Sequence, residues 1–211
     1  MQEELEPIER FKFACYPGIN CFNECCQNLN LALTPYDVLR MSRALELTTT
    51  EFLERYTSHH IGIVTGLPVV VLKMLPDGRC PFVTENGCSV YADRPTPCRL
   101  YPLARVRAGD EVQYYLLRED FCMGHMEGKE WSVVEWVEDQ EAEDYNEMND
   151  LFFELISAKN RSGRNLTDGE LERIYRACFD VDWFKKETGV DDDLEALKEG
   201  IRFSIDLISH V

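Results

Sequence analysis

Hydrophobic residues recur at helical spacing in the first third of the chain, behind two signals for the start of a helix. Thr34 is a good N-cap residue, and Pro35 suits the first helical position. Thr48 and Glu51 form a capping box, in which each residue satisfies a backbone N–H at the helix start. The pattern predicts one helix after Thr34 and a second that ends at about Tyr56.

The middle of the chain shows the pattern of short strands. The run from Leu67 to Leu75 is rich in Val and Leu and leads into a turn, so it predicts a strand. Residues 103–107 and 111–118 flank an Ala-Gly-Asp turn and predict a β-hairpin. His59 and His60 precede these strands, and we place them at the end of the second helix as solvated cations in preference to metal ligands.

Beyond about residue 130, apolar positions follow helical spacing almost throughout. Capping boxes at Ser132 and Thr167 predict two helix starts, and the aspartates at 191–193 favour a third. Cys178 falls on the apolar face of the helix after Thr167, and we interpret it as a core residue. The carboxylates between residues 127 and 154 are most simply a solvated face.

Together these elements predict an α+β protein in two parts. Residues 11–125 would form a small cysteine-rich metal-binding domain with a short β-hairpin, and residues 130–211 an acidic α-helical extension packed on it. With 211 residues, of which 45% are hydrophobic, the chain is long enough to bury a core.

The charge of the chain restricts its partners. A net charge of −17 repels the phosphate backbone of nucleic acids and the surface of anionic membranes, so we expect neither as a partner. No apolar run is long enough to span a bilayer, and the first ten residues lack the apolar region of a secretion signal. We therefore expect a cytoplasmic protein whose partners are a metal ion or cluster and a protein partner or substrate.

Eight of the nine cysteines lie in loops rich in Gly, Pro and Asn. They are Cys15, Cys21, Cys25, Cys26, Cys80, Cys88, Cys98 and Cys122. In the cytoplasm thiols stay reduced, so metal ligation is a better explanation for this clustering than a disulfide framework. We expect the two cysteine regions to fold against each other around metal, and eight thiolates divide naturally into two sites of four.

The adjacent cysteines are the informative part of the first region. Consecutive side chains usually diverge, so Cys25 and Cys26 serve two metal positions, or one ligates while its neighbour packs. No pairing of the eight thiols follows from the sequence.

The stretch from Cys80 to Pro102 is the centre of the predicted site. Its four prolines favour extended or turn geometry and should exclude a helix. Arg94 and Arg99 either offset the negative charge of a four-thiolate site or form salt bridges with the abundant carboxylates. His125 follows Cys122 in Cys-x2-His spacing, which is weakly typical of zinc sites, and we assign Cys122 alone as the ligand.

These motifs resemble those of a known family, the YkgJ-like cysteine-cluster proteins with zinc- or iron-chelating domains. The resemblance rests on Cys21-x3-Cys25-Cys26, on CPF and GCSVY around Cys80 and Cys88, and on Arg94-Pro95-x2-Cys98-Arg99. It covers roughly residues 11 to 125 and implies metal or iron–sulfur binding. The family includes relatives of flagellin lysine N-methylase. Here the first motif is looser than the family pattern, because Cys15 and Cys21 are spread apart.

Three functional interpretations follow. The first is a metal-binding protein that holds an iron–sulfur cluster, of the [4Fe-4S] type, or zinc. The second is a cluster-dependent protein-modifying enzyme similar to flagellin N-methylase, and the third is a zinc-stapled interaction protein. Thiolates suit iron–sulfur clusters and zinc alike, and the all-cysteine ligand set favours iron–sulfur. Residues 62–66, GIVTG, are too weak a signature for a methyl-donor site.

Overall fold

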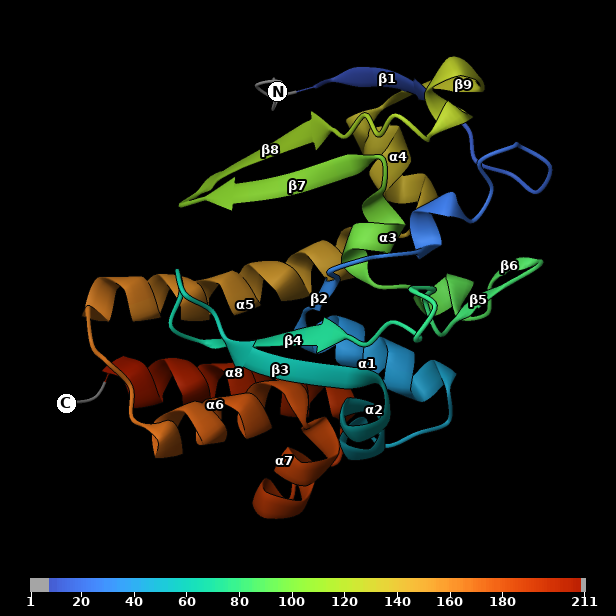
Figure 1. Ribbon diagram of the computed structural model, residues 1–211. Helices are drawn as coiled ribbons and strands as arrows, with labels where there is room; N and C mark the ends of the chain where they lie inside the picture. The colour runs from blue at the N-terminus through green and yellow to red at the C-terminus, as the bar shows by residue number, and fades with distance from the viewer. Residues whose placement is uncertain (1–7, 210–211) are drawn as a thin grey trace. The chain divides into compact units, whose positions relative to one another are not determined.

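The computed structural model of the chain describes residues 8–209, in which helices and short strands alternate (Figure 1). The helices are α1 (Pro35–Ala44), α2 (Thr49–Tyr56), α3 (Thr96–Leu100), α4 (Val133–Asp139), α5 (Glu143–Ser162), α6 (Asp168–Phe179), α7 (Val181–Thr188) and α8 (Asp193–Ser209). The strands are β1 (Arg10–Phe13), β2 (Ala32–Leu33), β3 (Thr57–Ile61), β4 (Pro68–Leu72), β5 (Val83–Thr84), β6 (Gly87–Cys88), β7 (Leu103–Ala108), β8 (Glu111–Leu116) and β9 (Lys129–Ser132). Short 3-10 helices span Glu24–Cys26, Tyr91–Asp93 and Met123–Met126. This mixture of helices and small sheets confirms the predicted α+β class.

The described residues divide into two compact units. The cysteine unit comprises residues 8–29, 74–91 and 96–143, and the helical unit comprises residues 30–73, 92–95 and 144–209. All eight cysteines of the predicted site belong to the cysteine unit, whereas Cys178 belongs to the helical unit. These units interleave along the chain and do not follow the expected division into 11–125 and 130–211. Whether those two ranges fold as separate domains stays a prediction.

The cysteine unit has its own aromatic core. β1 pairs antiparallel with β9, and β7 pairs antiparallel with β8. The buried core residues are Phe11, Phe13, Leu103, Leu116 and Trp136. Trp136 meets Phe11 and Phe13 edge to face, with ring centroids 5.7 Å and 5.6 Å away. Its Nε1 donates to the Leu100 carbonyl at 2.9 Å, so α4 is tied to the end of α3.

The helical unit combines a three-stranded antiparallel sheet with helix packing. β4 lies between β2 and β3, and the side chains of Pro68, Val70 and Leu72 on one face of β4 are buried. α6 and α8 approach so closely that a Cβ added at Gly200 would lie 1.9 Å from the Ala177 carbonyl oxygen. Only glycine fits at that contact.

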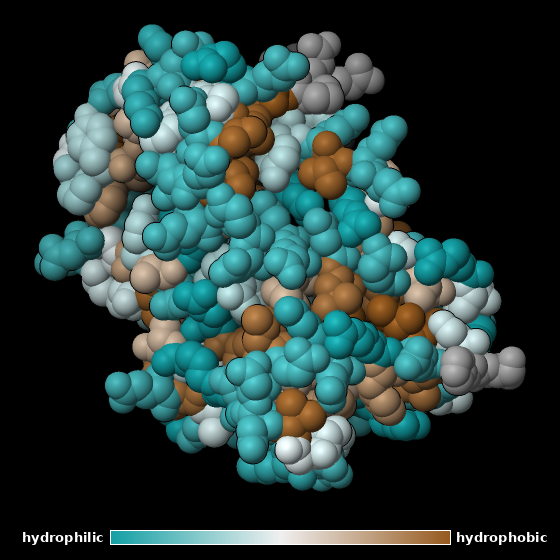
Figure 2. Space-filling view, turned by 180° about the vertical axis from the view of Figure 1, so that it is seen from behind, coloured by the Kyte–Doolittle hydropathy of each residue, from teal (hydrophilic) through white to brown (hydrophobic). Residues whose placement is uncertain are grey.

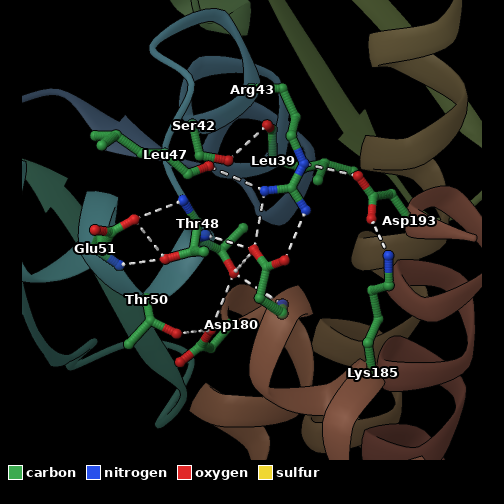
Figure 3. A network of polar contacts seen from close by, with 12 residues as sticks. Leu39, Ser42, Arg43, Leu47, Thr48, Thr50, Glu51, Asp180, Lys185 and Asp193 are labelled. Atoms are coloured by element: carbon green, nitrogen blue, oxygen red, sulfur yellow. Dashed lines mark hydrogen bonds and ion pairs between the residues drawn. The ribbon is translucent and has the colours of Figure 1, made fainter. Parts of the chain in front are cut away.

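A polar network joins four helices of the helical unit, α1, α2, α7 and α8 (Figure 3). Arg43 of α1 donates to both carboxylate oxygens of Asp182 on α7, at 2.9 Å and 3.0 Å, and to Asp193 of α8 at 2.7 Å. Lys185 donates to the other oxygen of Asp193 at 2.6 Å. The Thr49 backbone N–H donates to Asp182 at 2.6 Å, which fixes the start of α2 to α7. The planar guanidinium of Arg43 suits its contact with both carboxylate oxygens of Asp182.

The predicted helix starts are confirmed. Thr34, Thr48, Ser132 and Thr167 are the N-caps of α1, α2, α4 and α6, and each side chain accepts from the backbone N–H three residues later. In all four cases the acidic side chain of that residue accepts from the backbone N–H of the cap, so each start is a complete capping box.

Two local predictions are wrong. His59 and His60 do not end a helix but lie on β3, because α2 ends at Tyr56 and the chain turns directly into the sheet. The stretch of prolines does not exclude a helix either, since α3 contains Pro97 as its second residue. In the first turn of a helix the N–H that proline lacks has no partner in any case.

Figure 2 shows one face of the molecule, on which hydrophilic residues dominate and apolar residues gather in a few patches. Within residues 8–209, no helix combines the length and the apolar character needed to cross a membrane.

Candidate metal centre

The two cysteine regions meet through their backbones. The Cys80 N–H donates to the Cys26 carbonyl at 2.8 Å, and the Asn28 N–H donates to the Gly78 carbonyl at 2.7 Å. Between them, Gln27 and Arg79 form an antiparallel β-bridge. The prediction that the regions fold against each other is therefore confirmed for the chain segments.

A tight hairpin holds the next cysteine beside Cys80. The Val83 N–H donates to the Cys80 carbonyl at 3.2 Å, and Val83 in β5 pairs with Cys88 in β6. Asn23 donates from its side chain to the Thr84 carbonyl at 2.9 Å, which ties this hairpin to the first cysteine region.

The segment around Cys122 forms a third side of the site. The Met123 N–H donates to the Cys21 sulfur at 3.2 Å, and the Ala14 N–H donates to the Gly124 carbonyl at 3.1 Å. A Cβ at Gly124 would lie 2.6 Å from the Ala14 carbonyl oxygen, so the two segments touch through their backbones. Cys15 and Cys21 are thereby placed close to Cys122.

The adjacent thiols of Cys25 and Cys26 are in contact, with their sulfurs 3.9 Å apart. The hydrogen bond from Cys26 lowers the pKa of Cys25 to about 7. The same hydrogen bond, followed by burial and the neighbouring thiols, raises the pKa of Cys26. One thiolate is thus stabilised by its neighbour, and the thiolate is the form that binds metal.

Several of the other thiols lie near this pair. Partial burial, followed by the charges of Cys25, Cys21 and Cys122, raises the pKa of Cys15 to about 11. The pKa of Cys26 responds in addition to Cys98 and Cys80. Burial is the main cause that raises the pKa of Cys80, and the neighbouring thiols of Cys88 and Cys25 contribute. These interactions place Cys15 near Cys21, Cys25 and Cys122. They place Cys26 near Cys80 and Cys98, and Cys80 near both Cys88 and Cys25.

The cysteine side chains lie farther apart than the ligands of a formed metal site. Within residues 8–209, no three side chains of His, Cys, Asp or Glu converge closely enough to hold an ion as they stand. None of the nine cysteines, all of which lie in the described part of the chain, is in a disulfide. The donor chemistry suits soft metals such as zinc and iron, because eight sulfurs gather in one unit without competing crosslinks.

The other residues that the sequence singled out, Arg94, Arg99, His125 and Cys178, lie in different surroundings. Arg99 is buried and donates to the Gln140 carbonyl, and Arg94 is buried as well. The ring of His125 packs 5.4 Å from that of Phe13, and burial is the main cause that lowers its pKa. Cys178 is fully buried, 3.3 Å from the Ser204 hydroxyl, which confirms its assignment to the core.

Two residues near Cys122 have no signal in the sequence. Burial, followed by the neighbouring Cys122 thiol, raises the pKa of Tyr101, so this phenol lies beside the site. Gly128 has φ +88°, and a Cβ there would lie 2.5 Å from the Phe13 carbonyl oxygen. Only the pairing of β1 with β9 makes that closeness visible, and the pairing is distant in sequence.

The loops of this α+β unit bring eight cysteines together, which is typical of proteins that chelate metal through thiolates. The model of the CxxCxxCC family, described as "Putative zinc- or iron-chelating domain", matches residues 14–123, more than half of the 211-residue chain. The chain belongs to this family. No curated protein and no solved structure matches the chain.

Proposed function

We propose that the protein holds metal in two four-thiolate sites that meet at Cys25 and Cys26. The first site comprises Cys15, Cys21, Cys25 and Cys122, and the second comprises Cys26, Cys80, Cys88 and Cys98. The observation that carries the proposal is the contact between the adjacent thiols, together with the position of Cys15 near Cys25 and of Cys80 and Cys98 near Cys26. Each set contains four cysteines, the number that both a [4Fe-4S] cluster and tetrahedral zinc require.

The local structure supports a separate role for each adjacent cysteine. Residues 24–26 form a 3-10 turn, in which successive side chains point about 120° apart around the axis. Side chains at Cys25 and Cys26 can therefore serve different ions while their sulfurs remain in contact. Closure of each site requires the side chains to rotate inward from the arrangement described, which the exposure of Cys15 and Cys98 permits.

We assign iron–sulfur clusters of the [4Fe-4S] type in preference to zinc. The Met123 N–H that points at the Cys21 sulfur is the kind of hydrogen bond that adjusts the potential of a cluster. Bound iron–sulfur would supply one-electron chemistry, and the residues of this chain would supply the thiolates and shield them. Eight reduced thiols also fit a cytoplasmic protein.

The experiment is anaerobic purification of the full chain, followed by iron, sulfide and zinc analysis and a visible spectrum. Cys122→Ser and Cys98→Ser should each lower the metal content by about half, since each removes one ligand from a different site. The double variant should lose nearly all metal. Cys178→Ala is the control, because it removes a cysteine outside both sets and should leave the content unchanged.

Two results would contradict the proposal. If the protein contains neither iron nor zinc, and all eight thiols react with a thiol reagent in the native state, no thiolate site exists. If either single variant removes all the metal, the eight cysteines form one shared site and the division into two is wrong.

A further inference from the structure

The helical unit has an open sheet edge on β3. The Lys73 N–H donates to the Tyr56 carbonyl, and the Gly62 N–H donates to the Leu67 carbonyl, which fixes the hydrogen-bonded register between β3 and β4. In an antiparallel ladder the bonded positions alternate, so the backbone groups of His59 and Ile61 point away from β4. Among residues 8–209, no strand lies on that side of β3.

This edge lacks the features that usually protect one. Edge strands commonly carry lysines, prolines or bulges that prevent another strand from pairing with them. β3 reads Thr-Ser-His-His-Ile, and four of its five residues are exposed. The loop after it presents Ile63 and Val64, both of which are almost fully exposed. Apolar side chains at that exposure favour contact with a partner.

A pocket of about 250 Å³ lies along the same edge, lined by residues of α2, β3 and α6. The His59 ring stacks on Tyr175, with centroids 4.3 Å apart and planes at 29°. Tyr175 and Glu54 both line the pocket, together with Arg176 and Asp180. The pocket therefore offers an aromatic wall beside ionised groups.

The charges that face the pocket are mainly negative. Asp180 is buried and accepts from Thr49 at 2.9 Å and from Thr50 at 2.8 Å, and it lies at the start of α7 (Figure 3). Arg176 forms ion pairs with Glu172 at 2.9 Å and with Asp180 at 3.7 Å. Within the described chain Glu54 forms no ion pair, so its carboxylate is available to a ligand.

We propose that the β3 edge binds an extended cationic peptide segment, which adds as a further strand and places a Lys or Arg side chain beside Tyr175 and Glu54. Backbone pairing with His59 and Ile61 would supply the affinity, as in other strand-addition complexes. The aromatic ring and the Glu54 carboxylate would select the cation.

The net charge of the chain favours a cationic peptide over a second copy of the chain as the ligand of this edge. Two copies would each carry a net charge of −17 and repel one another, whereas a cationic segment is attracted to the chain. Side chains of a strand alternate, and Thr57, His59 and Ile61 share one face. The ligand should therefore carry its cation near His59 and an apolar residue two or four positions away, near Ile61 and the exposed loop.

The probe is a short, fluorescein-labelled peptide of alternating Thr and Val with one central Lys, titrated into the full chain by fluorescence anisotropy. Replacement of its Lys by Glu, or N-methylation of the backbone amides that face β3, should abolish measurable binding. In the protein, Ile61→Pro removes one outward N–H and leaves the bonds to β4, and should weaken binding about fivefold. Glu54→Lys should weaken it by a similar factor, about fivefold.

Glu187→Lys is the matched control, because it makes the same charge change on exposed α7 outside the pocket and should leave binding unchanged. Hydrogen exchange at the His59 and Ile61 amides should slow when the peptide binds. The proposal is overturned if the Glu-containing or N-methylated peptide binds equally well. It is also overturned if those amides are protected without peptide while the mass of the protein doubles, which would assign the edge to a dimer.

Discussion

The thiols of Cys25 and Cys26 show how one turn of backbone shapes the chemistry of the site. Asn23, with φ 71°, starts the 3-10 turn, and extended Gln27 ends it. The backbone conformations of these two residues set how the chain enters and leaves the turn that carries both sulfurs. Asparagine tolerates the left-handed backbone region better than most residues, so its presence is consistent with a sharp entry into the turn.

Asp193 shows how a single carboxylate links stability to pH. The hydrogen bond from Arg43 is the main cause that lowers its pKa from 3.8 to about 2, and Lys185 contributes. Because the folded-state pKa is the lower one, ionised Asp193 stabilises the fold above about pH 4. That contribution is lost as the pH falls from about 4 to about 2.

We predict that Asp193→Asn lowers the free energy of unfolding of α8 at neutral pH by about 1 kcal/mol, a value that allows for solvent screening. The variant should also lose less stability than the parent between pH 4 and pH 2. Native-state hydrogen exchange of α8 amides measures both effects. Asp191→Asn is the control, since it removes the same charge at an exposed position. An equal loss in that variant would show that general charge is responsible, and not the contact with Arg43.

The packing of helix on helix depends on glycine at one point. Gly200 of α8 faces the backbone of α6 at Ala177, and the residues on either side of this contact, Leu197 and Ile201, are fully buried. Helices that touch through their backbones leave no room for a side chain, and a packed interior resists displacement.

Gly200→Ala should therefore force α6 and α8 apart and destabilise the helical unit by about 3 kcal/mol or more. The measurement is the thermal unfolding midpoint by circular dichroism. Gly169→Ala, in the first turn of α6, is the matched control, because a Cβ there meets nothing within 4 Å. It should leave the midpoint unchanged or raise it slightly, as alanine favours helix. A Gly200→Ala protein as stable as the parent would contradict this account of the packing.

Across the molecule, the two units differ in what holds them together. The cysteine unit has one small aromatic core and long loops, whereas the helical unit buries apolar faces of several helices. A unit with a small core depends more on metal, because metal binding supplies folding free energy.

Removal of metal by a chelator under anaerobic conditions should accelerate hydrogen exchange in residues 14–29, 74–91 and 120–128. Exchange in α6 and α8 should change little, since their core contains no proposed ligand. The readout is hydrogen exchange by mass spectrometry on the full chain, with Cys178→Ala as a control that retains the metal. Unchanged exchange across the cysteine loops would show that metal contributes nothing to their stability.

The predictions that are confirmed depend on short stretches of chain. The four capping boxes each involve residues three positions apart, and the Val- and Leu-rich run of residues 67–75 contains β4. His59 and His60 were misplaced because the chain enters β3 directly after α2, and the pairing with β4 decides that. Pro97 was misread because the rule against proline does not apply to the first turn of a helix.

The local sequence was thus sufficient to predict thiols as the candidate metal donors, the helix starts and the α+β class. Capping and thiol chemistry depend on residues only a few positions apart. Only the tertiary structure decided which thiols are neighbours. The Cys26 and Cys80 segments meet through backbone hydrogen bonds, and Cys21 meets Met123 from a distant part of the chain. Such contacts form because pairing and core burial outweigh the entropy of closing long loops, a balance that belongs to the whole fold and is not encoded in any short motif.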